Sequence, residues 1–193
     1  MTSITVNYRV PHQTLMHASH YREFRGRASD GRLRSVDTIL GAMKKQPNSE
    51  MCFVCGRSNP VGLYMQFHDD GELEVVSEYS VPAHYQGYPG VVHGGVLAAM
   101  LDEVVARVSM IGDHHHFMMS VKLQILYRHP VPVETPLKVV GRILRLRGRL
   151  GKAEGKIFLP DGTVACESVM TLADVPEELL ASTHPKLLNW KLD

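Results

Sequence analysis

The chain has 193 residues, 44% of them hydrophobic and 21% charged, a composition typical of a globular domain with a core of its own. Its formal net charge of +1 argues against nucleic acid or an anionic membrane surface as the main partner. No apolar run reaches the roughly 18 residues of a membrane span, the N-terminus lacks the apolar core of a secretion signal, and three cysteines do not make a disulfide framework. We therefore expect a cytoplasmic protein.

Three parts are expected along the chain: an N-terminal extension over residues 1–48, one domain over 49–175 and a C-terminal tail over 176–193. The extension is polar and rich in Arg and His, and its one predicted helix covers residues 36–44. The tail is expected to hold a short helix.

The domain begins with two predicted strands, over 63–70 and 72–81, and continues with an apolar helix at about 94–110. Four more strands follow, and we expect them to form an antiparallel meander over 117–129, 137–147, 151–160 and 163–175. A single apolar helix must be wrapped by the sheet, or part of its circumference stays in water. The order of elements therefore predicts an α+β fold.

The predicted helix has two distinct faces. Large aliphatic side chains recur on one face at spacings of three and four residues, namely Leu97, Leu101, Val104 or Val105, and Val108. The other face carries Asp102 among small residues, namely Gly95, Ala98, Ala99, Ala106 and Ser109. Small residues let a backbone, a second helix or a ligand approach closely, so we predict a chemical role for Asp102, the alternative being a surface carboxylate. Glu103 lies one turn before Arg107, a spacing that suits an ion pair at an exposed edge.

The start of the helix is a second candidate site. Gly94 and Gly95 stand where a helix exposes unpaired N–H groups and the positive end of its dipole, so that a ligand oxygen can come close. His93 either takes part in the chemistry or holds the loop by hydrogen bonding. Eight residues separate Gly94 from Asp102, about 12 Å along the axis, so one carbonyl cannot contact both. Two antiparallel copies of the helix, related by a twofold axis, would bring Gly94 of one chain to Asp102 of the other.

The segments "YPGVVHGGVLAAMLDEVV" and "CFVCGRSNPVGL" resemble hotdog-fold thioesterases, specifically the phenylacetate-pathway (PaaI-like) branch, over about residues 52–173. The resemblance implies a long central helix wrapped by a curved antiparallel β-sheet, in a homodimer with active sites at the subunit interface, often within a dimer of dimers. It also implies hydrolysis of an acyl-CoA substrate without a cofactor. The Gly94 N–H would polarise the thioester carbonyl and His93 would shape the loop. Asp102 from the other subunit would act as general base on water or as nucleophile.

Two further positions follow from the resemblance. Ser120 matches a Ser or Thr that helps to hold the attacking water or the carboxylate, the alternative being a hydroxyl satisfied within its own strand. Some relatives place a carbonyl-binding Asn or Gln six residues before His93. That position is Gly87 in this chain, so the carbonyl-binding set departs from the family pattern, and the adjacent Gln86 is the alternative carbonyl-binding residue.

Basic residues near the end of the predicted strand over 137–147 are candidates for binding CoA. Arg145, Arg147 and Arg149 recur at every second residue, so on a strand they would share one face. Arg binds phosphate bidentately, and CoA carries phosphates. In the resembling enzymes the nucleotide is also bordered by the residues that match Tyr127, Arg128 and His129. The alternative for the arginines is a solvated basic face.

The pair Cys52-x-x-Cys55 is half of a zinc site, but no second cysteine pair follows in the sequence. Histidines from elsewhere would be needed to complete such a site. We therefore predict no metal and interpret the pair as reduced, partly buried thiols.

One alternative to an enzyme stays open: a non-catalytic acyl-CoA-binding or regulatory hotdog module. The presence of Asp102 argues against it. A hotdog hydratase is disfavoured because the Asp and His that it needs on one loop are not found near the helix.

Overall fold

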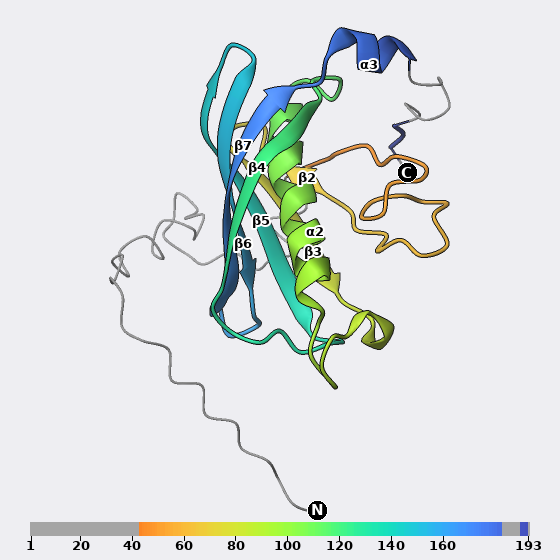
Figure 1. Cartoon of the computed structure of the whole chain (residues 1–193), viewed down its shortest axis with the longest axis vertical. Coiled ribbons are helices and arrows are strands. Elements are labelled where there is room, and N and C mark those ends of the chain that lie inside the picture. Colours follow the sequence, from red (N-terminus) through yellow and green to blue (C-terminus); the bar gives the residue numbers. More distant parts are fainter. Residues whose placement is uncertain (1–42, 183–189, 193) are drawn as a thin grey trace, which may run out of the picture. The chain divides into compact units, whose positions relative to one another are not determined.

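The computed structural model describes residues 43–182 and 190–192 (Figure 1). The described residues all belong to one compact unit, Ala42–Asp193. Most of the helix that we predicted over 36–44 lies outside the described residues, and its last residue, Lys44, opens a strand. The sheet thus begins four residues before the boundary that we predicted at residue 48.

A seven-stranded, fully antiparallel sheet forms the framework, with strand order β1-β2-β3-β5-β6-β7-β4. Its strands are β1 (Lys44–Lys45), β2 (His68–Asp69), β3 (Glu74–Ser80), β4 (Met118–Tyr127), β5 (Pro136–Arg147), β6 (Leu150–Phe158) and β7 (Val164–Asp174). The turns between the strands follow the sequence signals. Gly71 and Gly162 both have φ near +80°, which suits glycine in the turns of the β2–β3 and β6–β7 connections.

The predicted four-strand meander is wrong at its first strand. Only β5, β6 and β7 follow one another as neighbours, whereas β4 pairs with β7 at the far edge of the sheet. The chain therefore crosses from β4 to β5, which pairs with β3. Local strand patterns do not encode this crossover, because every strand in either arrangement is antiparallel to its neighbours.

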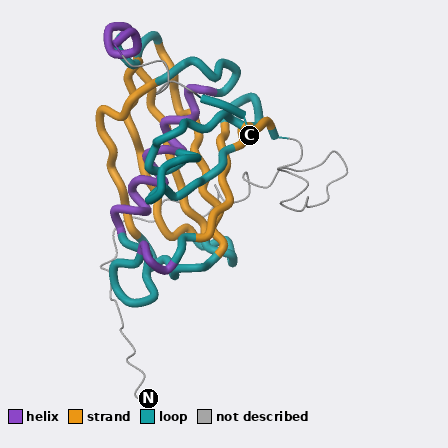
Figure 2. The backbone as a smooth tube through the Cα atoms, turned by 90° about the vertical axis from the view of Figure 1, so that its right-hand side faces the viewer, coloured by secondary structure: helices purple, strands orange, loops and turns teal. Residues whose placement is uncertain are grey.

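The long helix α2 (Gly94–Ala106) lies along one face of this sheet, and the 3₁₀ turn η3 (Arg107–Met110) extends it (Figures 1 and 2). The predicted aliphatic stripe is confirmed as the buried face, with Leu97, Leu101, Val104, Val105 and Val108 all in the core. Two shorter helices are η2 (Ala83–Tyr85) and α3 (Glu177–Ser182). The expected α+β arrangement, one central helix wrapped by an antiparallel sheet, is confirmed.

Two glycines set the height of α2 above the sheet. Gly141 and Gly155 are directly paired across β5 and β6. A Cβ on Gly141 would lie 2.3 Å from the Val104 carbonyl oxygen, and one on Gly155 would lie 2.6 Å from a Val105 methyl group. Side chains at these positions would therefore lift the helix off the sheet.

A non-regular segment over residues 46–67, which we call the covering segment, lies over another side of α2 together with residues 190–192. Here the Arg107 guanidinium lies 4.1 Å from the ring centre of Phe67 and 5.3 Å from that of Trp190. No helix among the described residues has both the length and the apolar character needed to cross a membrane.

Candidate active site

The first turn of α2 is capped by the histidine that precedes it. The Gly95 N–H donates to His93 Nδ1 at 2.9 Å, and the Val96 and Leu97 N–H groups reach the His93 carbonyl oxygen. No acceptor for the Gly94 N–H lies among the described residues. Gly94 therefore offers the one amide of this turn that a ligand carbonyl could use, while His93 holds the turn in shape.

Tyr127, the last residue of β4, packs over the same turn. Its hydroxyl donates to the Gly94 carbonyl oxygen at 2.9 Å, and a Cβ on Gly94 would touch its ring at 3.7 Å. Burial raises the pKa of the Tyr127 hydroxyl, which keeps it protonated as a donor. The end of β4 thus holds the Gly94 carbonyl group in place, close to the Gly94 N–H that lacks an acceptor among the described residues.

Asp102 meets β4 two turns further along the helix. The Ser120 hydroxyl donates to Asp102 Oδ1 at 2.6 Å and also contacts the sulfur of Met170 at 3.3 Å. Both Asp102 and Gly94 are partly exposed. The second carboxylate oxygen of Asp102 accepts no hydrogen bond from the described residues, so it is available to a water or a substrate atom.

The loop before the helix explains the departure from the family pattern at Gly87. A Cβ at this position would lie 3.3 Å from the Cα and the ring of His93, so a larger residue would crowd the capping histidine. The Gln86 side-chain oxygen accepts the Gly90 N–H at 2.9 Å. Gln86 therefore closes its own loop with the oxygen and keeps only its NH₂ group for a ligand.

The predicted phosphate-binding residues fall into two groups that one chain does not bring together. Arg145 and Arg147 lie at the end of β5, and the strand pairing puts this end of β5 at the same end of the sheet as the start of β4. Tyr127 lies at the opposite end of β4. Arg149 lies outside β5, because Gly148 and Arg149 form the β5–β6 turn, so the three arginines do not share one strand face.

The residues after Tyr127 are held by β7. The Arg128 side chain forms an ion pair with Glu167, and the backbone N–H groups of Arg128 and His129 both reach the Ala165 carbonyl oxygen. The charge of Arg128 is thus partly matched within the chain. Arg145, Arg147 and Arg149 are exposed, and no ion pair to them is found among the described residues.

Glu103 and Arg107 form the predicted ion pair, at 2.8 Å, but they do not lie at an exposed edge. Arg107 is only 1% exposed. Its guanidinium also donates to the carbonyl oxygen of Pro47 and to the side-chain oxygen of Asn48. The i,i+4 spacing predicted the pair, but it could not predict that a distant segment of the chain covers it.

One group of three side chains among the described residues could hold a metal ion, and sequence reasoning missed it. Cys52 and Cys55 come from the covering segment and Glu103 from α2. The Cys-x-x-Cys motif was the visible half of this group. The third member was hidden because Glu103 lies 48 residues further along the chain than Cys55.

The outer edge of the sheet at β4 is a further feature that the sequence did not reveal. β4 pairs only with β7, so its other side is unpaired among the described strands. Several of its apolar side chains are exposed, including Met119, Val121, Leu126 and Tyr127, with Val121 at 63%. An unpaired apolar edge is typical of a strand that a second chain covers.

Comparison with known proteins agrees with this geometry. Residues 89–166 match the family model described as thioesterase superfamily. Curated relatives include acyl-coenzyme A thioesterase THEM4 of Rattus norvegicus, 29% identical over 45% of this chain, and that of Bos taurus, 30% identical over 50% of it. Each match covers 36% of the relative, so this chain corresponds to about a third of these proteins.

Solved structures share the fold. A crystal structure of a thioesterase superfamily protein is 25% identical, with a TM-score of 0.59 over 81% of this chain and 73% of that one. The PaaI protein from the phenylacetic acid degradation operon of E. coli is 15% identical, with a TM-score of 0.53 over 59% of this chain and 81% of its own. A hypothetical thioesterase from Streptococcus pneumoniae, solved with coenzyme A, is 18% identical, with a TM-score of 0.50 over 54% of this chain and 80% of its own.

The sheet order, the helix along the sheet and the family match over the His-Gly-Gly turn all agree. Residues 89–166 match the thioesterase superfamily, and the described residues have the fold of the solved thioesterase superfamily structures, an antiparallel sheet with one central helix.

Proposed function

We propose that this protein hydrolyses an acyl-CoA thioester to a free acid and CoA, with Asp102 as general base and the Gly94 N–H as the donor to the thioester carbonyl. One observation carries the proposal: Asp102 is oriented by Ser120 on a partly exposed face of the same helix whose first amide has no acceptor among the described residues. The names of the relatives support the choice of substrate class.

The chemistry requires one base and one donor. Asp102 takes a proton from water while the water oxygen attacks the carbonyl carbon, and the π electrons move onto the carbonyl oxygen. The Gly94 N–H donates to the negative charge that develops there. When the tetrahedral intermediate collapses, the C–S bond breaks, and the CoA sulfur leaves with its electron pair and takes up a proton.

Two chains are needed, because Gly94 and Asp102 lie eight residues apart on one helix, about 12 Å along its axis. We propose a twofold homodimer in which the edges of β4 meet and the two α2 helices lie antiparallel. The exposed apolar side chains of β4 support this arrangement. The small residues beside Asp102, including Ala98 and Ala99, would permit the close approach of the second helix.

The exposed arginines at the β5–β6 turn are proposed to bind the CoA phosphates, with Tyr127, Arg128, His129 and the turn at Gly95 nearer the thioester end. Replacing both Arg145 and Arg147 by Gln should raise KM for an acyl-CoA. The same change should leave KM unchanged for the matching N-acetylcysteamine thioester, which carries no phosphate. Equal effects on both substrates would contradict phosphate binding.

Hydrolysis is tested by thiol release from a panel of acyl-CoAs that covers short, long and aryl acyl groups. The comparison is between the wild-type protein and Asp102→Ala, with Glu78→Gln as a control that removes an exposed carboxylate from β3. We expect release from at least one substrate by the wild type and the control, and its loss in Asp102→Ala.

Two outcomes would overturn parts of the proposal. Unchanged release by Asp102→Ala would exclude Asp102 as the base. No release from any substrate, together with tight binding of acyl-CoA, would favour the non-catalytic module. Sedimentation at assay concentrations tests the dimer, and an active monomer would exclude a site shared between chains.

A further inference from the structure

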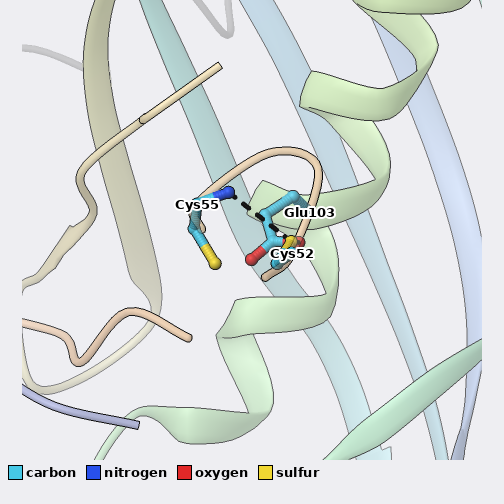
Figure 3. A group of neighbouring side chains, drawn as sticks. All are labelled: Cys52, Cys55 and Glu103. Atoms are coloured by element: carbon cyan, nitrogen blue, oxygen red, sulfur yellow. Dashed lines mark hydrogen bonds between the residues drawn. The ribbon is translucent and has the colours of Figure 1, made fainter. Parts of the chain in front are cut away.

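The three potential metal ligands lie on the side of α2 away from Ser120. The Sγ atoms of Cys52 and Cys55 and a carboxylate oxygen of Glu103 all lie within 4.8 Å of one another (Figure 3). Cys55 is fully buried, and Cys52 and Glu103 are half-buried. Two thiols and a carboxylate from separate segments thus converge on one point with limited access to water.

The loop over residues 52–56 is shaped to present both sulfurs. The N–H groups of Val54 and Cys55 point at Cys52 Sγ, at 3.3 and 3.5 Å. The Gly56 N–H donates to the Cys52 carbonyl oxygen at 2.9 Å, and a Cβ on Gly56 would lie only 2.3 Å from that oxygen. The turn therefore needs glycine after the second cysteine, and two of its amides face the Cys52 sulfur.

The Glu103 carboxylate is placed and oriented as a metal ligand would be. Glu103 Oε2 lies 3.4 Å from Cys52 Sγ. A tetrahedral zinc site, with Zn–S of about 2.3 Å and Zn–O of about 2.0 Å, places sulfur and oxygen about 3.5 Å apart. The other oxygen, Oε1, accepts from Arg107 Nε at 2.8 Å, the kind of outer contact that orients a ligating carboxylate. The largest separation in the group, up to 4.8 Å, would contract by about 1 Å on binding.

The charges also balance. Two thiolates and one carboxylate carry three negative charges, and a divalent cation with the buried Arg107 guanidinium supplies three positive ones. A neutral group of this kind is acceptable in a place with little water. Sulfur ligands select zinc over magnesium or calcium, which prefer oxygen.

We propose that Cys52, Cys55 and Glu103 bind one Zn²⁺ ion, with water as the fourth ligand, and that this ion fastens the covering segment to α2. The site lies apart from Asp102 and Ser120, so its role is structural. The ion would link the covering segment to α2, in addition to the hydrogen bonds from Arg107 to Pro47 and Asn48.

The experiment uses the full chain, reduced and treated with a chelator, then titrated with Zn²⁺ or Co²⁺ alone. We expect one metal per chain by elemental analysis, thiolate-to-cobalt charge-transfer bands with the visible bands of tetrahedral Co²⁺, and a Tm that rises with Zn²⁺ concentration. Cys52→Ser and Cys55→Ser should weaken binding at least about 100-fold, and Glu103→Gln about tenfold or more. Cys166→Ser, which changes a buried thiol of β7, is the matched control and should bind like the wild type.

The wild-type titration needs no variant, so it decides the matter even if a substitution prevents folding. Absence of the charge-transfer bands and of a Zn²⁺-dependent Tm in the reduced protein would overturn the proposal, as would binding by Cys52→Ser equal to that of the wild type. A metal-free protein with a Cys52–Cys55 disulfide on isolation and no uptake after reduction would also overturn it. None of these readouts measures thioester hydrolysis, so the outcome is independent of the proposed activity.

Discussion

Asp102 and Glu103 are adjacent acids on one helix, and both are partly exposed, yet they contact different parts of the molecule. Asp102 faces β4, accepts a hydrogen bond from Ser120 and retains access to solvent. Glu103 faces the covering segment, pairs with the buried Arg107 and lies against Cys52. A helix turns by about 100° per residue, so neighbours point to different sides.

The difference separates two tasks. On the Glu103 side, both carboxylate oxygens of Glu103 have partners within the chain, and the Arg107 guanidinium donates to three groups and packs against two aromatic rings. On the Asp102 side, one carboxylate oxygen and one helix amide have no partner in the part of the chain that the structure describes, so other molecules can use them. The first arrangement suits stability, and the second suits binding and chemistry.

The largest effect is expected from Asp102→Asn. The amide has nearly the same shape and its oxygen can still accept from Ser120, but it is not a base. Removal of a general base costs about 10²- to 10⁴-fold in kcat. The assay is thiol release from the best acyl-CoA, with Tm measured in parallel.

The same assay on Glu103→Gln completes the comparison between the two acids. This change leaves the buried Arg107 charge without its carboxylate, so Tm should fall clearly, whereas Asp102→Asn should leave Tm nearly unchanged. If both variants lowered Tm by the same amount, and each lost activity only as far as its loss of stability explains, the two acids would not have separate catalytic and structural roles.

Arg107→Met is expected to lower the free energy of unfolding by about 3 kcal/mol, the lower end of the range for breaking a buried pair, because Glu103 keeps some exposure. The loss includes the donors to Pro47 and Asn48. Urea unfolding measures it. Arg142→Met is the control: its pair with Glu74 is long, at 3.8 Å, and partly exposed, so the change should cost less than about 1 kcal/mol. Similar losses in both variants would contradict the special position of Arg107.

The sequence predicted one side of the helix better than the other. The period of the aliphatic residues identified the buried face, and the spacing of Gly94 and Asp102 identified two separate candidate sites. These patterns depend only on the spacing of residues along one helix, so they can be found in the sequence without knowledge of the tertiary contacts. The role of β4 as an edge strand, the burial of Arg107 and the approach of Cys52 to Glu103 depend on contacts between segments far apart in the chain, which periodicity does not contain.

Ser120→Ala tests the contribution of the Ser120 hydrogen bond to Asp102. The hydroxyl donates to a charged acceptor, and its loss should reduce kcat about tenfold, which corresponds to about 1.4 kcal/mol. Ser120→Thr keeps the hydroxyl and suits a strand, so it should restore most of the rate. If Ala and Thr behaved alike, the hydroxyl would serve only its own strand.

The smallest effect is expected from Tyr127→Phe. The change removes the hydrogen bond to the Gly94 carbonyl oxygen and keeps the ring that packs over the helix start. A neutral hydrogen bond is worth about 0.5–1 kcal/mol, so the rate should fall about two- to fivefold. The choice of substrate shows where Tyr127 acts. If it fixes the peptide beside the Gly94 amide, kcat falls equally for an acyl-CoA and for the matching N-acetylcysteamine thioester. If it contacts the nucleotide instead, only KM for the acyl-CoA rises, and the helix start is held by the His93 cap without help from β4.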